Sequence, residues 1–340
     1  MNKEIILITD SKNKIPQKAH ETESLDINEL YNQLSELGYS VNVTNYFNII
    51  NFYKKEDIKN NIFFYASSQY LIYKNYINDC LLYIMENGGI LLPNYSIFNA
   101  HENKVYQELE KKRIDIMAPK SYIIGTIEEA KKTLNEIEYP FIAKVSSGFG
   151  SRGVQKVRNK REGKSFIKKN MKSLDGSSIF EKGTHLYRKI KFRKCYPQKT
   201  GKIIFQEMLK NLDCDWKVLV FYDRIYTLKR YTRKNDFRAS GSGLFDFDAV
   251  PSNKVLDFAI DISQKLKTPL LSLDIVEKND KTYLIEYQGL HYGLITAIDN
   301  KSYYQKSNEN IWTEKNNTLT VEENFVYAIN HYILNYNEVL

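Results

Sequence analysis

The sequence predicts an α/β protein whose first hundred or so residues are α/β and whose C-terminal half is α+β. Near the N-terminus, short apolar runs alternate with segments that carry apolar side chains at helical spacing, which is typical of a parallel sheet with crossover helices. In the second half, runs rich in β-branched and aromatic residues follow one another closely, which indicates antiparallel strands. A chain of 340 residues is long enough for two or three lobes with separate cores.

The N-terminal part is expected to alternate strands with helices. Its apolar runs predict strands at 3–8, 41–47, 61–69 and 90–95. Its helical patterns lie in 29–40, where Gly38 marks the end of the helix, and in 70–89, which ends in Gly88 and Gly89; glycine is a common signal for the end of a helix. This order favours a parallel sheet over roughly the first hundred residues.

The rest of the chain is expected to contain strands with fewer helices between them. The predicted helices are 103–114, 127–137 and 253–267. The predicted strands are 117–124, 139–147, 202–209, 215–232, 269–278 and 281–289. The close succession of strands in this half predicts antiparallel pairing, with the helix 253–267 packed on one side.

Four features that suit phosphate and metal binding follow one another along the chain. Lys144 lies near the end of an expected strand, and a glycine-rich loop, 148–153, follows it. A later strand ends at Glu207, and two final strands carry Asp274 and Glu286. Glycines let backbone N–H groups approach phosphate oxygens, and a lysine supplies positive charge. The sequence contains no GxxxxGK[ST] motif, which excludes a P-loop.

Asp274 and Glu286 are expected to face each other across a hairpin. The strands 269–278 and 281–289 are joined by an Asn-Asp turn, which suits a tight two-residue connection. Because both acids have apolar neighbours in the sequence, burying them without a partner would be costly. Two carboxylates on adjacent strands suit Mg²⁺ that also binds nucleotide phosphates.

This ordered set resembles the ATP-grasp superfamily, most closely its carboxylate–amine ligases such as the ribosomal-protein glutamate ligases, and more distantly the D-alanine–D-alanine ligases. The resemblance covers about residues 101–300. It implies an ATP-grasp fold with an N-terminal α/β domain (1–100) and two lobes that clasp ATP. The small lobe (101–209) would carry the glycine-rich flap and a basic insertion, and the large lobe (210–340) the metal site.

The resemblance also assigns ligands to individual residues. Those expected to bind ATP are Lys104, Lys144, Gly148, Gly150, Ser151, Gly153, Glu207, Leu209 and Asp215. Glu207 and Leu209 would pair with adenine through their backbone, and Asp215 would accept the ribose hydroxyls, with Asp213 as the alternative. Those expected to bind Mg²⁺, or Mn²⁺ in its place, are Asp274, Glu286 and Gln288. The family usually has asparagine where this chain has Gln288, which leaves one or two metal ions open.

Two arginines reproduce the spacing that these ligases use for the reacting groups. Arg230 and Arg238 are the expected catalytic residues, because a guanidinium binds a carboxylate through two parallel bonds and stabilises developing charge. Lys217 and His291 are the expected substrate-binding residues. The implied reaction activates a carboxylate as an acyl phosphate, which an amine then attacks to form an amide, with release of ADP and phosphate. Neither substrate is named by these residues.

Positive charge is concentrated between residues 159 and 200. This segment has thirteen lysines or arginines against three acids, within a chain of net charge +8. It is interpreted either as a docking surface for an anionic substrate, such as a glycan precursor, a nucleotide-linked sugar or an acidic peptide, or as a solvated insertion or oligomer contact. Alternative functions are a small-molecule kinase, a catalytically silent ATP-binding regulator and, last, a nucleic-acid-binding protein. No specific nucleic acid is expected.

Targeting and redox signals are few. No apolar run approaches the roughly 20 residues that span a bilayer, and the N-terminus is interpreted as a first strand rather than a signal peptide. The three cysteines show no metal-ligand spacing. We therefore expect a cytoplasmic protein without a membrane partner, and a homodimer stays open.

Overall fold

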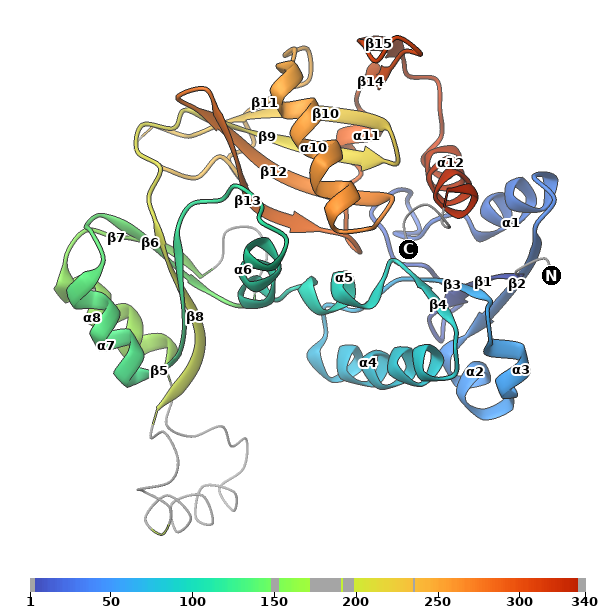
Figure 1. Cartoon of the computed structure of the whole chain (residues 1–340), viewed down its shortest axis with the longest axis horizontal. Helices are drawn as coiled ribbons and strands as arrows, with labels where there is room; N and C mark the ends of the chain where they lie inside the picture. The colour runs from blue at the N-terminus through green and yellow to red at the C-terminus, as the bar shows by residue number, and fades with distance from the viewer. Residues whose placement is uncertain (1–3, 148–152, 172–190, 192–198, 235, 336–340) are drawn as a thin grey trace. The chain divides into compact units, whose positions relative to one another are not determined.

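The computed structural model describes residues 4–147, 153–171, 191, 199–234 and 236–335. The chain divides into two compact units (Figure 1). The first unit comprises Met1–His101, Cys214–Tyr231 and Gly243–Leu340, and the second comprises Glu102–Asp213 and Thr232–Ser242. The first unit therefore joins the N-terminal third to most of the C-terminal third. The three-part division expected from the sequence stays a prediction.

A four-stranded parallel sheet forms the N-terminal part of the first unit. Its strands lie in the order β2-β1-β3-β4. They are β1 (Glu4–Thr9), β2 (Ser40–Asn45), β3 (Ile62–Tyr65) and β4 (Ile90–Leu92). The connecting helices are α1 (Ile27–Glu36), α2 (Tyr46–Phe52), α3 (Lys55–Ile58) and α4 (Leu71–Glu86), and α5 (Tyr95–Ala100) follows β4. The parallel sheet predicted for this part of the chain is present.

Local signals explain where these elements begin and end. Asp26 caps α1 by accepting hydrogen bonds from the backbone N–H groups of Asn28 and Glu29. The turn after α1 contains Gly38 with φ of +88°, a conformation that glycine adopts without strain. The predicted strand 41–47 ends earlier than expected, because the Asn45 side chain accepts from the N–H of Asn48 and starts α2 there.

A seven-stranded sheet forms the second part of the first unit. Its strands lie in the order β13-β12-β9-β10-β14-β15, with β11 paired to β10, and every neighbouring pair is antiparallel. The strands are β9 (Cys214–Phe221), β10 (Arg224–Tyr231), β11 (Phe245–Asp246), β12 (Leu270–Lys278), β13 (Lys281–Gln288), β14 (Ser302–Lys306) and β15 (Trp312–Asn316). The helices are α10 (Asn253–Lys265), α11 (Ile295–Ile298) and α12 (Val321–Leu334). The predicted antiparallel strands and the helix near 253–267 are present.

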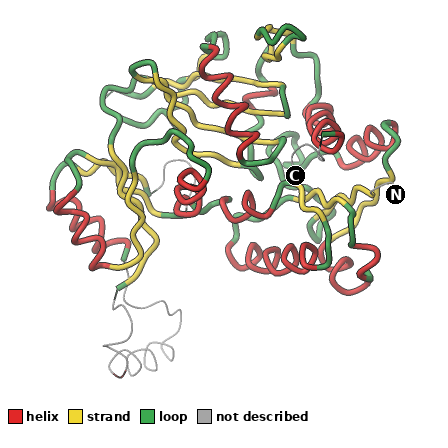
Figure 2. Tube along the Cα trace, viewed as in Figure 1, coloured by secondary structure: helices red, strands yellow, loops and turns green. Residues whose placement is uncertain are grey.

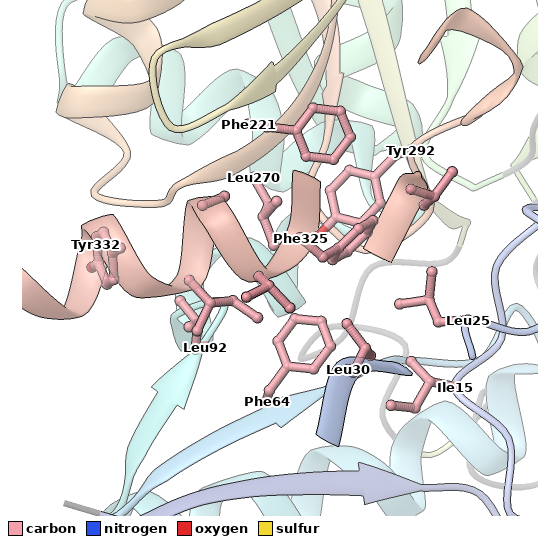
Figure 3. Close-up of a cluster of buried hydrophobic side chains, with 14 of the residues drawn as sticks. Ile15, Leu25, Leu30, Phe64, Leu92, Phe221, Leu270, Tyr292, Phe325 and Tyr332 are labelled. Carbon is pink, nitrogen blue, oxygen red and sulfur yellow. The ribbon is translucent and has the colours of Figure 1, made fainter. Parts of the chain in front are cut away.

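One hydrophobic core links the two sheets of the first unit. Phe64 from β3, Phe221 from β9 and Phe325 from α12 are buried in the same cluster (Figure 3). The rings of Phe64 and Phe221 each lie edge-on to Phe325, with centroids 6.0 and 5.6 Å away. Burying large aromatic side chains contributes strongly to stability. The N-terminal and C-terminal segments are thus held together by α12.

The second unit is built on a smaller antiparallel sheet with strand order β5-β8-β6-β7. The strands are β5 (Ser121–Thr126), β6 (Phe141–Val145), β7 (Val154–Val157) and β8 (Thr200–Glu207). The helices are α6 (Lys104–Arg113), α7 (Ile127–Glu136) and α8 (Lys160–Asn170). Phe141, Phe166 and Phe205 pack in its core, which is separate from that of the first unit.

The helices in both units are of ordinary length, as Figure 2 shows. The longest that the structure describes is α4, with 16 residues. Within the described ranges, no helix combines the length and the apolar character needed to cross a membrane.

Candidate functional site

Strand register gathers five of the predicted site residues in the seven-stranded sheet. Arg230 on β10 is paired with Asp215 on β9. Asp274 on β12 is paired with Lys217 on β9 on one side and with Glu286 on β13 on the other. The β12–β13 connection is the two-residue Asn-Asp turn, and both of its residues have positive φ, as a tight hairpin requires. Residues up to 57 positions apart in sequence thus become cross-strand neighbours.

The charged side chains of this group form an ion-pair network. Arg230 Nε and Nη2 donate to the two carboxylate oxygens of Asp215 at 2.7 and 2.8 Å. Arg230 Nη2 also lies 2.9 Å from Asp274 Oδ1, and Lys217 Nζ lies 3.5 Å from the same oxygen. Asp215 and Arg230 are buried. Two carboxylates and two cations balance, and the nearby Glu286 adds a further negative charge.

The pKa values of the two aspartates reflect this network. Burial raises the pKa of Asp215 to about 6, and Arg230 only partly offsets that rise. Burial also acts on Asp274, but Arg230 and Lys217 together hold the pKa of Asp274 below its usual value. Asp274 therefore stays ionised at neutral pH, and its negative charge is available to a cation.

Glu286 also contacts a second group of polar side chains, which lies at and after the end of β13. Gln288 Nε2 donates to Glu286 Oε1 at 3.2 Å, and Gln288 Oε1 lies 3.4 Å from His101 Nδ1. The His101 ring lies beside the His291 ring, with centroids 4.9 Å apart. Burial, reinforced by His291 and Lys74, lowers the pKa of His101 to about 3. Burial also lowers the pKa of His291, so both rings are neutral at neutral pH.

Asp274 and Glu286 fit a hard divalent cation. They are cross-strand neighbours, and Asp274 Oδ1 makes no hydrogen bond of good geometry with any described residue, despite its ion pair with Arg230. The described part of the chain contains no group of three or more acidic, histidine or cysteine side chains that could hold a metal ion. Nucleotide oxygens and water would have to complete the coordination. Gln288 turns its amide nitrogen toward Glu286, so a metal role for Gln288 requires the amide to turn over and stays a prediction.

Asp215 and Arg230 form an ion pair with each other, and this pairing affects the role predicted for each of them. Both Asp215 oxygens accept from Arg230, so a ribose hydroxyl would compete with a bidentate ion pair. Arg230 contacts two carboxylates of its own chain, so it can act on the reaction through Asp274. The ribose role of Asp215, with Asp213 as the alternative, and the catalytic role of Arg230 stay predictions.

In the second unit, a short chain of bonds brings the predicted lysines into one region. The backbone N–H of Lys104 donates to the carbonyl of Ser146, which follows Lys144 and β6. Asn103 caps α6 and also accepts from Ser146 Oγ at 2.9 Å. Lys104 and Lys144 are each 6% exposed. The N-terminus of α6 is therefore fixed to the end of β6, which the glycine-rich loop follows in the sequence.

A buried carboxylate, which the sequence did not single out, balances part of this charge. Glu108 Oε1 lies 2.8 Å from Lys111 Nζ, and Glu108 Oε2 accepts from Ser121 Oγ at 2.6 Å. Burial would raise the pKa of Glu108, but Lys111 and Lys144 hold it below its usual value. Lys144 is thus within electrostatic reach of a buried acid.

The glycine-rich loop is described only at its end. Gly153 has φ of +76°, and a Cβ there would lie 2.3 Å from Val145 Cγ2, so only glycine fits. Gly148, Gly150 and Ser151 lie outside the described residues. So does most of the basic segment 159–200, of which 172–190 and 192–198 are not described.

Three further predicted site residues belong to the second unit. Glu207 and Leu209 lie at the end of β8, and Arg238 lies in the segment Thr232–Ser242. Glu207 is the last residue of β8, its N–H donates to the Lys120 carbonyl, and Leu209 follows two residues later. Arg238 binds Asp236 through two nitrogens, with Nε–Oδ1 and Nη2–Oδ2 distances of 2.9 and 2.8 Å. The side chain of Arg238 is 40% exposed. The adenine and catalytic roles of these residues stay predictions.

The fold agrees with comparisons to known proteins. A family model for the carbamoyl-phosphate synthase L chain, ATP binding domain, matches residues 103–196. A RimK domain protein of ATP-grasp type from Sphaerobacter thermophilus DSM 20745 has a similar structure, with 10% identity, a TM-score of 0.52 and coverage of 96% of this chain and 98% of that chain. This chain has the ATP-grasp fold. The α/β class and the resemblance inferred from the sequence are confirmed.

Two further ATP-grasp structures are similar over nearly their whole length. D-alanyl-alanine synthetase A from Vibrio cholerae O1 biovar eltor str. N16961 is 13% identical, with a TM-score of 0.53 and coverage of 98% of this chain and 100% of that chain. A RiPP-associated ATP-grasp ligase from Chryseobacterium gregarium, solved with ADP and a leader and core peptide, is 13% identical, with a TM-score of 0.52 and coverage of 99% and 97%. Among curated proteins, no sequence matches this chain.

Proposed function

We propose that this chain is an ATP- and magnesium-dependent ligase that joins a carboxylate to an amine through an acyl phosphate. The observation that carries the proposal is the pair of acids Asp274 and Glu286, set side by side on β12 and β13 next to Lys217 and Arg230. Carboxylates on neighbouring strands bind a divalent ion, and cations beside them attract phosphate and carboxylate groups. The ATP-grasp fold supports nucleotide-dependent ligation in general.

Lys104 and Lys144 are the proposed phosphate-binding residues. Both fall within the segment that matches an ATP-binding family model, and both are buried. A lysine in a site that excludes water interacts strongly with a phosphate oxygen, since the local dielectric constant is low. Gly153, where a side chain would collide with Val145, allows the loop backbone to approach the same oxygens.

Asp274 and Glu286 would hold the magnesium ion, or manganese in its place. When bound, the ion would supply positive charge that offsets the negative charge of the β- and γ-phosphates. Arg230 positions Asp274 by its contact to Oδ1. Lys217, which also contacts Asp274, is a second cation for the substrate side of the site.

The proposed reaction has two steps, formation of the acyl phosphate and formation of the amide. A carboxylate oxygen attacks the γ-phosphorus, and ADP leaves with the electrons of the broken bond. The amine nitrogen then attacks the acyl carbon, phosphate leaves, and the nitrogen loses a proton. Arg238 is the proposed residue that orients the carboxylate and stabilises developing charge. No protein nucleophile is required, which suits a site made of lysines, arginines and acids.

The proposed function does not identify which carboxylate and which amine are the substrates. The names of similar structures range from a peptide ligase to a D-alanyl-alanine synthetase, so the fold does not select one acid and amine. Docking of an anionic glycan precursor, nucleotide-linked sugar or acidic peptide on the basic segment stays a hypothesis, as does a cytoplasmic location.

An isotope experiment tests the proposal directly. Candidate acids labelled with ¹⁸O in the carboxylate are incubated with amines, ATP and Mg²⁺, and the released phosphate is analysed by mass spectrometry. Transfer of one ¹⁸O to phosphate, together with ADP and an amide product, is expected. A phosphorylated product without free phosphate would indicate a kinase instead. ATP binding without turnover across the whole panel would indicate a silent nucleotide-binding regulator.

A further inference from the structure

Helix α4 carries apolar side chains on two opposite faces. One face is buried and includes Ile77, Leu81 and Ile84. The other face is exposed, yet it carries Ile72 and Tyr76, which are four residues apart and therefore neighbours on the helix surface. Ile72 is 89% exposed, more than any other large apolar residue that the structure describes. A surface helix normally presents polar residues to solvent, so this second apolar face indicates a contact with another molecule.

The exposed apolar surface extends from α4 onto the neighbouring helix α2, which lies on the same side of the parallel sheet (Figure 1). The rings of Tyr46 from α2 and Tyr76 from α4 meet edge to face, with centroids 6.5 Å apart. Phe47 and Phe52 of α2 pair with each other at 5.8 Å. The exposed apolar residues of the two helices and of the position before α4 are here named the α2–α4 patch: Phe47, Phe52, Tyr70, Leu71, Ile72 and Tyr76.

The size of the α2–α4 patch fits a specific protein interface. Its six residues are between 41% and 89% exposed. Since a large apolar or aromatic side chain has on the order of 200 Å² of surface, the patch exposes roughly 800 Å². The largest apolar patch on a typical monomer is about 300–600 Å², and a specific interface buries about 800 Å² on each partner. The patch is therefore large enough to form a stable interface.

The chemistry of the patch favours a neutral, apolar partner. None of its six side chains is charged. Lys74, the one charged residue among positions 71–78, donates to the His101 carbonyl and lies over the Phe98 ring. An anionic membrane or a nucleic acid requires a cluster of basic side chains, so neither suits this surface. Charges of both signs follow Phe52 at positions 54–57, as in the polar rim of an interface.

We propose that the α2–α4 patch is the interface of a homodimer, in which it contacts the same patch of a second copy of this chain. A twofold interface joins one surface to itself, so that surface must be self-complementary. An uncharged apolar patch meets this condition, because it brings no like charges together. Two copies with a net charge of +8 repel each other, so contact is favoured where both surfaces are neutral. The inference concerns association and is independent of the proposed ligase reaction.

Sedimentation velocity of the full-length protein tests the proposal. The wild type is expected to sediment with twice the mass of one chain. Ile72→Glu places two carboxylates in the interface, one from each copy, and should weaken the dimer by about 100-fold or more, because each buried charge lacks a partner. Phe52→Glu should weaken it similarly from the α2 side. Both side chains are exposed within one chain, so neither substitution disturbs the core.

Val250→Glu is the matched control. Val250 is 72% exposed and lies in the same unit but outside the patch, so the same substitution there should leave the dimer intact. Circular dichroism verifies that each variant is folded.

Hydrogen exchange followed by mass spectrometry locates the interface in the unmodified protein. Peptides that cover 46–52 and 70–76 are expected to exchange more slowly at high protein concentration than at low concentration. A peptide that contains Val250 should exchange at the same rate in both.

Two results would overturn the proposal. The first is a wild-type protein that stays monomeric up to about 100 μM, above the micromolar limit typical of interfaces of this size. The second is a dimer that survives Ile72→Glu and Phe52→Glu together. In either case the patch would bind a different molecule or none.

Discussion

Arg230 binds both carboxylate oxygens of Asp215 across the β9–β10 strand pair, at 2.7 and 2.8 Å. The same guanidinium reaches Asp274, so one buried arginine joins three adjacent strands. Each of these three charged groups loses favourable hydration when it is buried. The ion pairs offset that cost only while all three groups are present. This relationship makes the centre of the sheet sensitive to single substitutions.

Arg230→Gln is expected to destabilise the protein by about 3–5 kcal/mol, because it leaves two carboxylates buried without their cation. Urea unfolding followed by circular dichroism measures the loss. Lys254→Ala is the control: its ion pair with Asp280 is at the surface, and its removal should change stability by about 0–1 kcal/mol. Similar stabilities for the two variants would show that the Arg230 network contributes little.

Glu286→Gln is expected to weaken Mn²⁺ binding in the presence of ADP by about 10- to 100-fold, because a carboxylate ligand is lost. Electron paramagnetic resonance of free Mn²⁺ gives the affinity independently of turnover. Asp280→Asn removes an exposed acid from the β12–β13 turn and should leave the affinity unchanged. Full Mn²⁺ affinity in Glu286→Gln would place the cation elsewhere.

Lys144→Ala is expected to raise the dissociation constant of a non-hydrolysable ATP analogue by about 10- to 100-fold, since a charged phosphate contact is lost. Isothermal titration calorimetry measures it. Lys144→Arg should retain part of the affinity, and Lys168→Ala, an exposed lysine of α8 in the same unit, all of it. If Lys144→Ala binds the analogue normally, its predicted nucleotide role is wrong.

His101 is expected to lower the stability as the pH falls below 6.5, against an opposite contribution below about pH 6 from Asp215, whose raised pKa favours protonation in the folded state. The pKa of His101 drops from 6.5 to about 3 on folding, so the unfolded chain binds a proton that the folded chain rejects. This group's contribution is fully present above pH 6.5 and is lost at up to about 1.4 kcal/mol per pH unit below it. Urea unfolding of the metal-free protein between about pH 7 and pH 5 gives the slope. In His101→Asn the stability should change with pH in the direction of greater stability at low pH, relative to the wild type, because only the Asp215 contribution remains. An identical slope would mean that His101 does not titrate as described.

The local patterns of the sequence predicted much of this molecule. The alternation of apolar runs gave the parallel sheet, and the Asn-Asp dipeptide between two strands gave the hairpin that sets Asp274 beside Glu286. These features depend on residues a few positions apart, where backbone preference and side-chain spacing act directly. The short helix α2 was missed because Asn45 caps it inside an apparently continuous strand pattern.

The sequence by itself determined the residue types of the site, their order and the strands that carry them. Only the tertiary structure decided their partners: Arg230 with Asp215 and Asp274, Glu108 with Ser121 and near Lys144, and His101 against His291. His101 and His291 are 190 positions apart and share no sequence motif. Their contact follows from packing α5 and β13 in one unit, which brings the two rings together and buries both of them.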